Sequence, residues 1–303
     1  MEYILLSCAV LLGVSKNVFT KIVKKKSEDF YDMMKMNVIT FSIALITVFL
    51  IGIASIKTTF YVPWLLVIGY AVCMFSAQIA LMKAVELGSV SLSSLFYSCG
   101  FILPTLFGGI YYKEVINALH IIGIALIIVA FVFSTKKSED KKFNFGWLIA
   151  ALAGMFFAGM LGILQKIFTN EYAQYKLDNF LCVAFVFMIL MSAVAMFIAR
   201  LKKEKKERKD EPAAETVKTS MLIKQYGFTV LLGVVLGLGN KCNTYLTGVL
   251  PSVILFPIMN GGIIFITTLS SMILFKEKLS FVQKIGLLIG FLAIACITVA
   301  KVV

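Results

Sequence analysis

The stretch LGLGNKCNTYL (236–246) places strongly polar side chains inside an apolar segment that has the length of a helix. The polar residues recur at helical spacing, on one face and the stripe beside it: Asn240, Lys241, Asn243, Thr244 and Tyr245. A lysine at the centre of a membrane helix costs roughly 2.5–3.5 kcal/mol, so such residues usually face a cavity or a partner. We predict that this patch is one wall of a solute-binding site, in which Lys241 contacts an anionic group. The alternative is a lysine satisfied by backbone carbonyls or by the membrane surface.

A second group of polar residues stands in two segments that resemble each other, GVSKNVFT and GILQKIFT. The first contains Lys16 and Asn17, and the second contains Gln165 and Lys166. Lys16 and Lys166 are secondary candidates because a long cationic side chain can also extend to the membrane surface. The two shorter amides cannot reach so far, so we expect Asn17 and Gln165 to contribute to binding.

Tyr97 and Asn260 lie in the middle of two further apolar segments, each beside glycine residues. Pro104 and Pro257 stand in the same two segments, and we expect them to interrupt both helices, since proline removes an amide donor and kinks a helix. Polar side chains beside a break in a membrane helix are typical of transporter sites. Gln78 corresponds, within one residue, to the patch around Lys241 and completes the predicted site.

Ten long apolar segments must position these residues. Of the 303 residues 60% are hydrophobic and 15% are charged, whereas about a quarter of the residues of a soluble domain are charged. Stretches of about 18–25 apolar residues are long enough to cross a bilayer as helices. We therefore predict an all-α membrane protein with the following spans: 3–21, 33–55, 61–83, 88–111, 116–134, 146–169, 177–199, 226–247, 250–275 and 280–301.

The basic residues outside the spans gather in the odd-numbered loops. They follow the first span, the fifth span and, in the charged linker 200–224, the seventh span: Lys21, Lys24, Lys25, Lys26, Lys136, Lys137, Lys141 and Lys142. The positive-inside rule then places these loops in the cytoplasm and both termini outside. The net charge of +13 is thus explained by topology and by contact with anionic lipids, not by nucleic acid.

The two halves of the chain resemble each other. SVSLSSLFYSCGFILPTLFGGIYYKE (89–114) aligns without a gap with SVILFPIMNGGIIFITTLSSMILFKE (252–277), and both end in Lys-Glu. We predict two repeats, 1–135 and 146–303, of five spans each. Because five is odd, the second repeat enters the membrane from the opposite face. Such inverted repeats are typical of secondary transporters, which bind solute between the copies; duplication could also build a channel or a scaffold.

The chain resembles the EamA-like branch of the drug/metabolite transporter superfamily. The resemblance rests on residues 86–114 and 250–280 with the glycine-rich helix that follows, and it covers nearly the whole chain. It implies ten helices and transport of one of many solutes, among them amino acids, nucleosides, choline, sugar phosphates, nucleotide sugars and drugs. Two features depart from relatives: many have both termini in the cytoplasm, and small multidrug-resistance relatives use a carboxylate deep in the first helix.

The ionisable residues that we place deep in the membrane are lysines without carboxylates at similar depth. A positively biased cavity favours an anionic, zwitterionic or polar neutral solute. Aromatic rings such as Tyr97 and Tyr245 can also stack on a quaternary ammonium, so export of organic cations or drugs is the alternative. A membrane receptor or scaffold is the alternative of another class.

Enzyme chemistry is not expected. The chain has one histidine, and its six cysteines fall in six different spans, so the sequence offers no cluster of metal-ligand spacing. We expect no cofactor, no metal and no nucleic acid. The expected partners are a small solute and membrane lipids, for a monomer or homodimer in the inner or plasma membrane.

Overall fold

The computed structural model describes residues 2–25, 30–53, 62–88, 90–135, 145–207, 219–274 and 280–299. Over these ranges the chain forms α-helices and no strand, as predicted. The helices are α1 (Glu2–Lys25), α2 (Phe30–Gly52), α3 (Trp64–Leu87), α4 (Val90–Cys99), α5 (Ile102–Tyr111), α6 (Ala118–Thr135), α7 (Phe145–Glu171), α8 (Leu177–Glu207), α9 (Thr219–Val249), α10 (Ser252–Leu274) and α11 (Phe281–Val299). The basic runs at 136–144 and the Lys-Glu pair at 276–277 lie outside the described residues.

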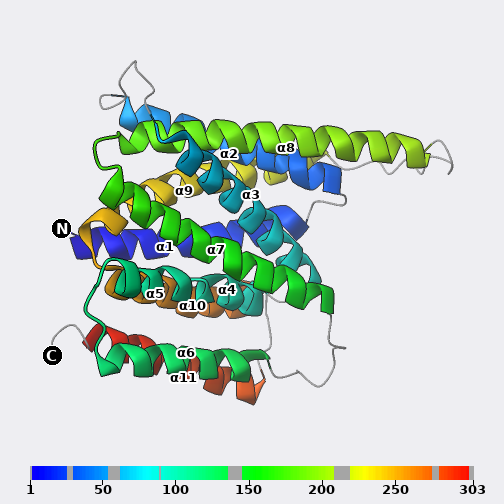
Figure 1. Ribbon diagram of the computed structural model, residues 1–303. Helices are drawn as coiled ribbons and strands as arrows, with labels where there is room; N and C mark the ends of the chain where they lie inside the picture. Colours follow the sequence, from blue (N-terminus) through cyan, green and yellow to red (C-terminus); the bar gives the residue numbers. More distant parts are fainter. Residues whose placement is uncertain are drawn as a thin grey trace.

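The helices lie side by side as one bundle, and their connections lie at its two ends (Figure 1). At one edge α2 packs against α8, and at the opposite edge α6 packs against α11. Between these pairs, α1 packs against α9, α3 against α7, and α10 against both α4 and α5. Helices α1 and α10 thus meet helices from far along the chain, and the central helices surround the site described below.

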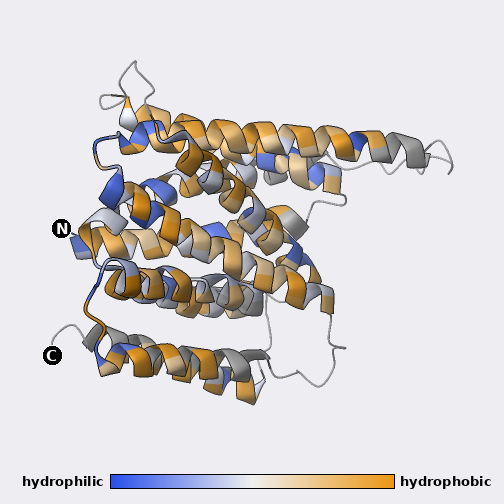
Figure 2. Cartoon of the chain, in the orientation of Figure 1, coloured by the Kyte–Doolittle hydropathy of each residue, from blue (hydrophilic) through white to orange (hydrophobic). Residues whose placement is uncertain are grey.

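Most residues of the helices are hydrophobic (Figure 2), and many large apolar side chains are exposed on the outside of the bundle. Leu65, Ile110 and Ile4 are 89%, 79% and 72% exposed, a pattern expected of lipid-facing residues and not of a soluble surface. Within the described ranges six helices are long and apolar enough to cross a membrane, namely α1, α2, α3, α7, α8 and α10. The protein is therefore a multi-pass membrane protein; the number of ten crossings stays a prediction.

The predicted span 88–111 is divided into α4 and α5, and the break occurs at Gly100. The amide of Leu103 donates to the carbonyl of Gly100 over 3.1 Å, one residue short of the α-helical spacing. Pro104 explains this tightening, because it has no amide hydrogen and its ring would meet the carbonyl four residues earlier. A Cβ atom at Gly100 would overlap the carbonyl oxygen of Met155 in α7, so glycine is required where the junction touches α7.

The interruption predicted at Pro257 is wrong. α10 continues from Ser252 to Leu274 with Pro257 inside it. Pro257 stands near the start of the helix, so its ring faces the carbonyl of Val253, in the first turn. There the chain can adjust without ending the helix.

Candidate functional site

A cavity of about 130 Å³ lies at the centre of the bundle, lined by residues of α1, α3, α4, α5, α7, α9 and α10. It is similar in size to the ~150 Å³ engineered cavity that binds benzene, so it suits a small solute. Most of its wall is apolar. The polar residues on the wall are Lys16, Asn17, Tyr97, Ser98, Gln165, Asn240, Asn243 and Asn260. Except for Ser98, all of these were predicted from the sequence.

One side of the cavity carries a cation beside an aromatic ring. The Nζ atom of Lys16 donates to the Tyr97 hydroxyl over 3.0 Å and lies 4.6 Å from the centre of its ring. Within the described ranges, no carboxylate lies within ion-pair distance of Lys16. An ammonium has three donors and a phenol has one. Two ammonium hydrogens and the phenolic hydrogen therefore stay available to an anionic group.

Another part of the wall carries a network of amides centred on Gln165. Its Nε2 atom donates to the hydroxyls of Tyr70 (3.2 Å) and Thr244 (2.8 Å). Its Oε1 atom accepts from Nδ2 of Asn243 over 2.9 Å. The Tyr70 hydroxyl in turn donates to Oδ1 of Asn240 over 2.8 Å. These bonds fix the positions of the three amides that face the cavity.

Tyr70 belongs to this network but was not predicted from the sequence. Its side chain is fully buried, and its ring packs 5.1 Å from that of Phe180, which stacks on Phe168 at 4.1 Å. The only signal available was its type, since a tyrosine buried in an apolar helix needs a partner for its hydroxyl.

Two further wall residues have simpler surroundings. Asn260 donates from Nδ2 to the carbonyl of Phe256 over 2.8 Å, and no donor among the described residues reaches its Oδ1 atom. Asn17 donates to the Thr267 hydroxyl over 3.4 Å. Asn243 resembles Asn260, because its Oδ1 atom has no hydrogen-bond partner in the described part of the chain.

Lys241 lies outside the cavity wall. Its Nζ atom forms an ion pair of 2.7 Å with Oδ1 of Asp178, and the two side chains are 25% and 8% exposed. The prediction that the deep lysines lack carboxylates is therefore wrong for Lys241. Asp178 stands in the first turn of α8, where the helix dipole favours an anion, and folding brings this turn beside α9.

The remaining predicted site residues are also off the wall. Thr244 is fully buried and reaches the site only through Gln165. Tyr245 is 52% exposed, and Gln78 is buried without lining the cavity. The patch around Lys241 thus contributes two of its five residues to the wall.

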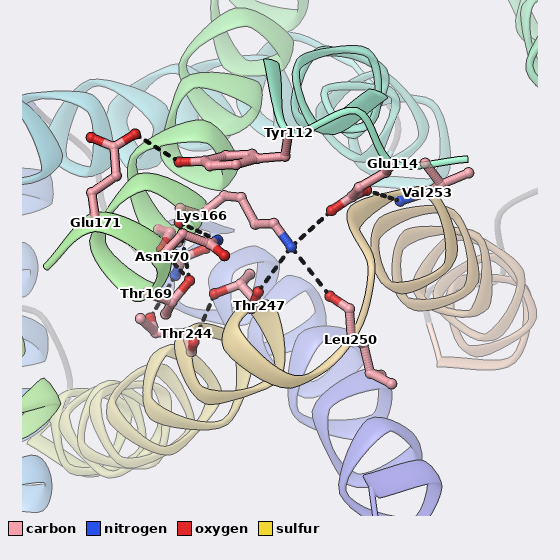
Figure 3. A network of polar contacts seen from close by, with 11 residues as sticks. Tyr112, Glu114, Lys166, Thr169, Asn170, Glu171, Thr244, Thr247, Leu250 and Val253 are labelled. Carbon is pink, nitrogen blue, oxygen red and sulfur yellow. Dashed lines mark hydrogen bonds and ion pairs between the residues drawn. The ribbon is translucent and has the colours of Figure 1, made fainter. Parts of the chain in front are cut away.

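Lys166 forms a second buried ion pair, 2.9 Å from Oε1 of Glu114 (Figure 3). The ammonium also donates to the carbonyls of Thr247 (3.3 Å) and Leu250 (3.5 Å), at the end of α9. The Oε2 atom of Glu114 accepts from the amide of Val253, at the start of α10, over 3.2 Å. A cation at a helix C-terminus and an anion at a helix N-terminus are both favourable. The pair therefore joins α7 and the segment after α5 to the end of α9 and the start of α10. Lys166 therefore also pairs with a carboxylate, and the prediction that the deep lysines lack carboxylates is wrong for this residue as well.

Tyr112 covers this ion pair from the segment that follows α5 (Figure 3). The Nζ atom of Lys166 lies 5.9 Å from the centre of its ring, and its hydroxyl donates to Oε1 of Glu171 over 3.0 Å. Burial raises the pKa of Tyr112, and the hydrogen bond to the Glu171 carboxylate raises it further.

In the ranges that the structure describes, His, Cys, Asp and Glu side chains form no group of three or more that could hold a metal. The expectation of no metal and no cofactor stays a prediction. What the cavity wall offers is hydrogen bonding and one ammonium, which suit binding.

An apolar helical bundle around a small, polar-lined cavity defines a multi-pass membrane protein of the transporter type. Residues 3–136 match the model of the EamA-like transporter family. This match confirms, over the residues matched, the family resemblance predicted from the sequence. Proteins of this family are membrane transporters of the drug/metabolite type. The match therefore favours a transporter over an enzyme.

The chain is also similar to two proteins over nearly its whole length. It is 24% identical over 308 residues to an uncharacterized protein of Haemophilus influenzae, covering 95% of each chain. A solved structure, described only as the crystal structure of a protein, covers 97% of each chain with a TM-score of 0.62 and 16% identity. The similarity to the solved structure shows that another protein has this fold.

Proposed function

We propose that this protein is a secondary carrier that moves a small polar metabolite through the central cavity by alternating access. Its scaffold is a pair of inverted repeats, and an anionic or zwitterionic solute fits the wall better than a neutral one. The observation that carries the solute class is Lys16, a cation on the cavity wall that pairs with no described carboxylate.

The matched cavity walls support the inverted repeats. Aligning GVSKNVFT of α1 with GILQKIFT of α7 and extending the register towards the N-terminus pairs Ala9 with Ala158, Leu12 with Leu161, Gly13 with Gly162, and Lys16 with Gln165. All of these residues line the cavity. Tyr97 and Asn260, which match in the other alignment, line it as well. Paired positions around one cavity are expected when two copies enclose it.

The helix packing has the same symmetry. Exchanging each helix for its counterpart in the other repeat turns the contact of α1 with α9 into that of α7 with α3. The same exchange leaves the α2–α8 and α6–α11 pairs unchanged. Rocking one repeat against the other is the alternating-access movement that such architectures support.

The polar groups indicate what binds where. A carboxylate or phosphate of the solute contacts Lys16 and the Tyr97 hydroxyl, while Gln165, Asn240, Asn243 and Asn260 orient the remainder. Lys241 is a weaker candidate, because Asp178 already holds its ammonium. Organic cations are disfavoured, since the ammonium of Lys16 occupies a position against the Tyr97 ring that a quaternary ammonium would take.

Thermal unfolding of the purified protein with a panel of amino acids, hydroxy acids, sugar phosphates and choline tests this assignment. A ligand of the folded state raises the unfolding temperature by mass action. We expect an anionic or zwitterionic compound to do so, with the effect lost in Lys16→Ala and retained in Lys16→Arg. The control is Lys83→Ala, which removes a lysine from an exposed ion pair with Glu86.

Uptake of the stabilising compound into proteoliposomes then separates a carrier from a receptor or scaffold. A shift produced by choline alone, or an unchanged shift in Lys16→Ala, would overturn the assignment of the anionic group. Binding without flux would overturn the carrier function itself.

A further inference from the structure

We propose that the Lys166–Glu114 pair, with the helix ends it joins, is a latch that holds one mouth of the cavity closed. The latch consists of these two side chains, the carbonyls of Thr247 and Leu250, and the amide of Val253. The inference rests on the proposed carrier function, because only a carrier that alternates between two states must open this mouth.

The latch lies between the cavity and one end of the bundle. On α7 the wall residue Gln165 directly precedes Lys166. On α9 the last wall residue is Asn243, and α9 continues from it to Thr247. All these segments run towards the end of the bundle at which α1 begins and α11 ends (Figure 1). The latch therefore stands directly on the path that a solute would take to this end.

The latch ties the two halves of the chain together. Glu114 belongs to the first half, whereas Lys166 and the ends of α9 and α10 belong to the second. Its side chains are only 8% and 12% exposed. Separating such a pair leaves a buried charge without compensation, so the state in which the latch is formed is stabilised over the state in which the halves have moved apart.

At the opposite end of the path, the tie that the described residues form is weaker. The position in α1 that matches Lys166 is Asn17, which forms one neutral hydrogen bond of 3.4 Å to Thr267. The glutamate that matches Glu114 is Glu277, outside the described residues. Among the described residues, one end thus has a charged pair and the matching position at the other end has a neutral contact.

A chain of hydrogen bonds connects the cavity to the latch. Gln165 contacts Thr244 from the wall side, the carbonyl of Thr244 accepts from the Thr247 hydroxyl over 2.7 Å, and the carbonyl of Thr247 accepts from Lys166. A solute that displaces Gln165 moves α7 relative to α9, and this movement lengthens the contacts of Lys166. Solute binding would thus open the latch.

Cysteine labelling tests the latch without knowledge of the solute. The reporter is Ser98→Cys, a near-isosteric change on the cavity wall, in a full-length chain whose native cysteines are replaced; none of these lines the cavity. A membrane-impermeant maleimide is applied to right-side-out and to inside-out vesicles. We expect Lys166→Met to raise labelling from the latch end about tenfold, within the usual range of coupling between sites, and to lower labelling from the other end.

Two further variants make the result decisive. Lys166→Met with Glu114→Gln removes both charges, so no buried ion is left unpaired and the fold is preserved; it should open the mouth as much as the single change. Lys83→Met breaks an exposed ion pair and should change nothing. Unchanged labelling in the folded double variant would show that the Lys166–Glu114 pair only stabilises the fold, and this result would overturn the latch. A rise at the latch end without a fall at the other end would support the latch and contradict alternating access.

Discussion

At the scale of single residues, Gln165 does the most to shape the cavity. One amide serves Tyr70, Thr244 and Asn243 at once. Without Gln165 each of these groups would lose one hydrogen bond, and a buried group left unpaired costs about 1–3 kcal/mol. The wall is thus positioned before any solute arrives.

Replacing Gln165 by leucine should lower the free energy of unfolding by about 1–3 kcal/mol, because its partners lose their hydrogen bonds. The loss should be less than additive in Gln165→Leu with Asn243→Leu, since both changes remove the same bond. Chemical unfolding in detergent measures both values. Ser7→Ala, which removes an exposed bond to the chain's own backbone, should change stability by less than ~0.5 kcal/mol; additive losses would contradict the network.

The two lysines Lys16 and Lys241 should behave in opposite ways. Lys241→Ala removes the ammonium that pairs with the largely buried Asp178 carboxylate, so we expect a stability loss of more than about 1 kcal/mol and an unchanged unfolding shift with solute. Lys16→Ala should keep the stability and lose the shift. Thermal unfolding of both variants, with and without the stabilising solute, compares them; loss of the shift in Lys241→Ala would restore that residue to the binding site.

Sequence patterns identified polar positions well but not their partners. Spacing and hydrophobic context predicted that Asn240, Asn243 and Gln165 share a site, and the structure brings them to one cavity. They did not reveal that Asp178 pairs with Lys241, because that contact joins two helices whose relative rotation is set by packing. Tyr70 was not predicted for the same reason, because its hydroxyl finds its hydrogen-bond partners only where α3 packs beside α7 and α9.

At the scale of helices, the junction between α4 and α5 is the sharpest local feature. Gly100 faces Gly159 of α7, and a Cβ atom at Gly159 would lie 2.6 Å from the Gly100 carbonyl oxygen. The chain thus brings two backbones into contact beside Tyr97, and this close approach holds the tyrosine ring at the cavity.

Gly100→Ala should destabilise the protein by about 1–3 kcal/mol, the usual range for overpacking, because the new methyl group meets backbone that cannot rotate away. Gly227→Ala is the matched control, since no atom lies within 4 Å of its new Cβ and alanine favours a helix over glycine. Unfolding temperatures of the two variants decide the comparison. Equal stability of both would mean that the junction relaxes freely.

Helix positions were more predictable than helix breaks. Apolar length alone gives segments that agree with α1, α7 and α10 to within a few residues. Proline and glycine together predicted a helix break in each of two segments. The break occurs between α4 and α5, but α10 is continuous. The two prolines differ in their surroundings. The junction between α4 and α5 is in close contact with the backbone of α7, whereas Pro257 affects only the first turn of its own helix.

At the scale of the whole molecule, charge distribution predicts the orientation. The basic loops should lie in the cytoplasm, so both termini should lie outside. Alkaline phosphatase fused after Val303 should be active on intact cells, because this enzyme folds outside the cytoplasm. Moving the lysines of 136–142 to the preceding loop should reduce this activity, and a fusion that is inactive while correctly inserted would reverse the assignment.

The halves of the chain interleave, since α1 packs on α9 and α3 on α7. Two identical halves would give inward-open and outward-open forms of equal energy. In the proposed carrier, Lys166 has Asn17 as its counterpart in the first repeat and so removes that equality, and the empty carrier would prefer one resting form. Each return of the empty carrier would then have to separate a buried ion pair, whereas a loaded carrier is helped across by its solute. Such a protein would exchange one solute molecule for another faster than it accumulates either.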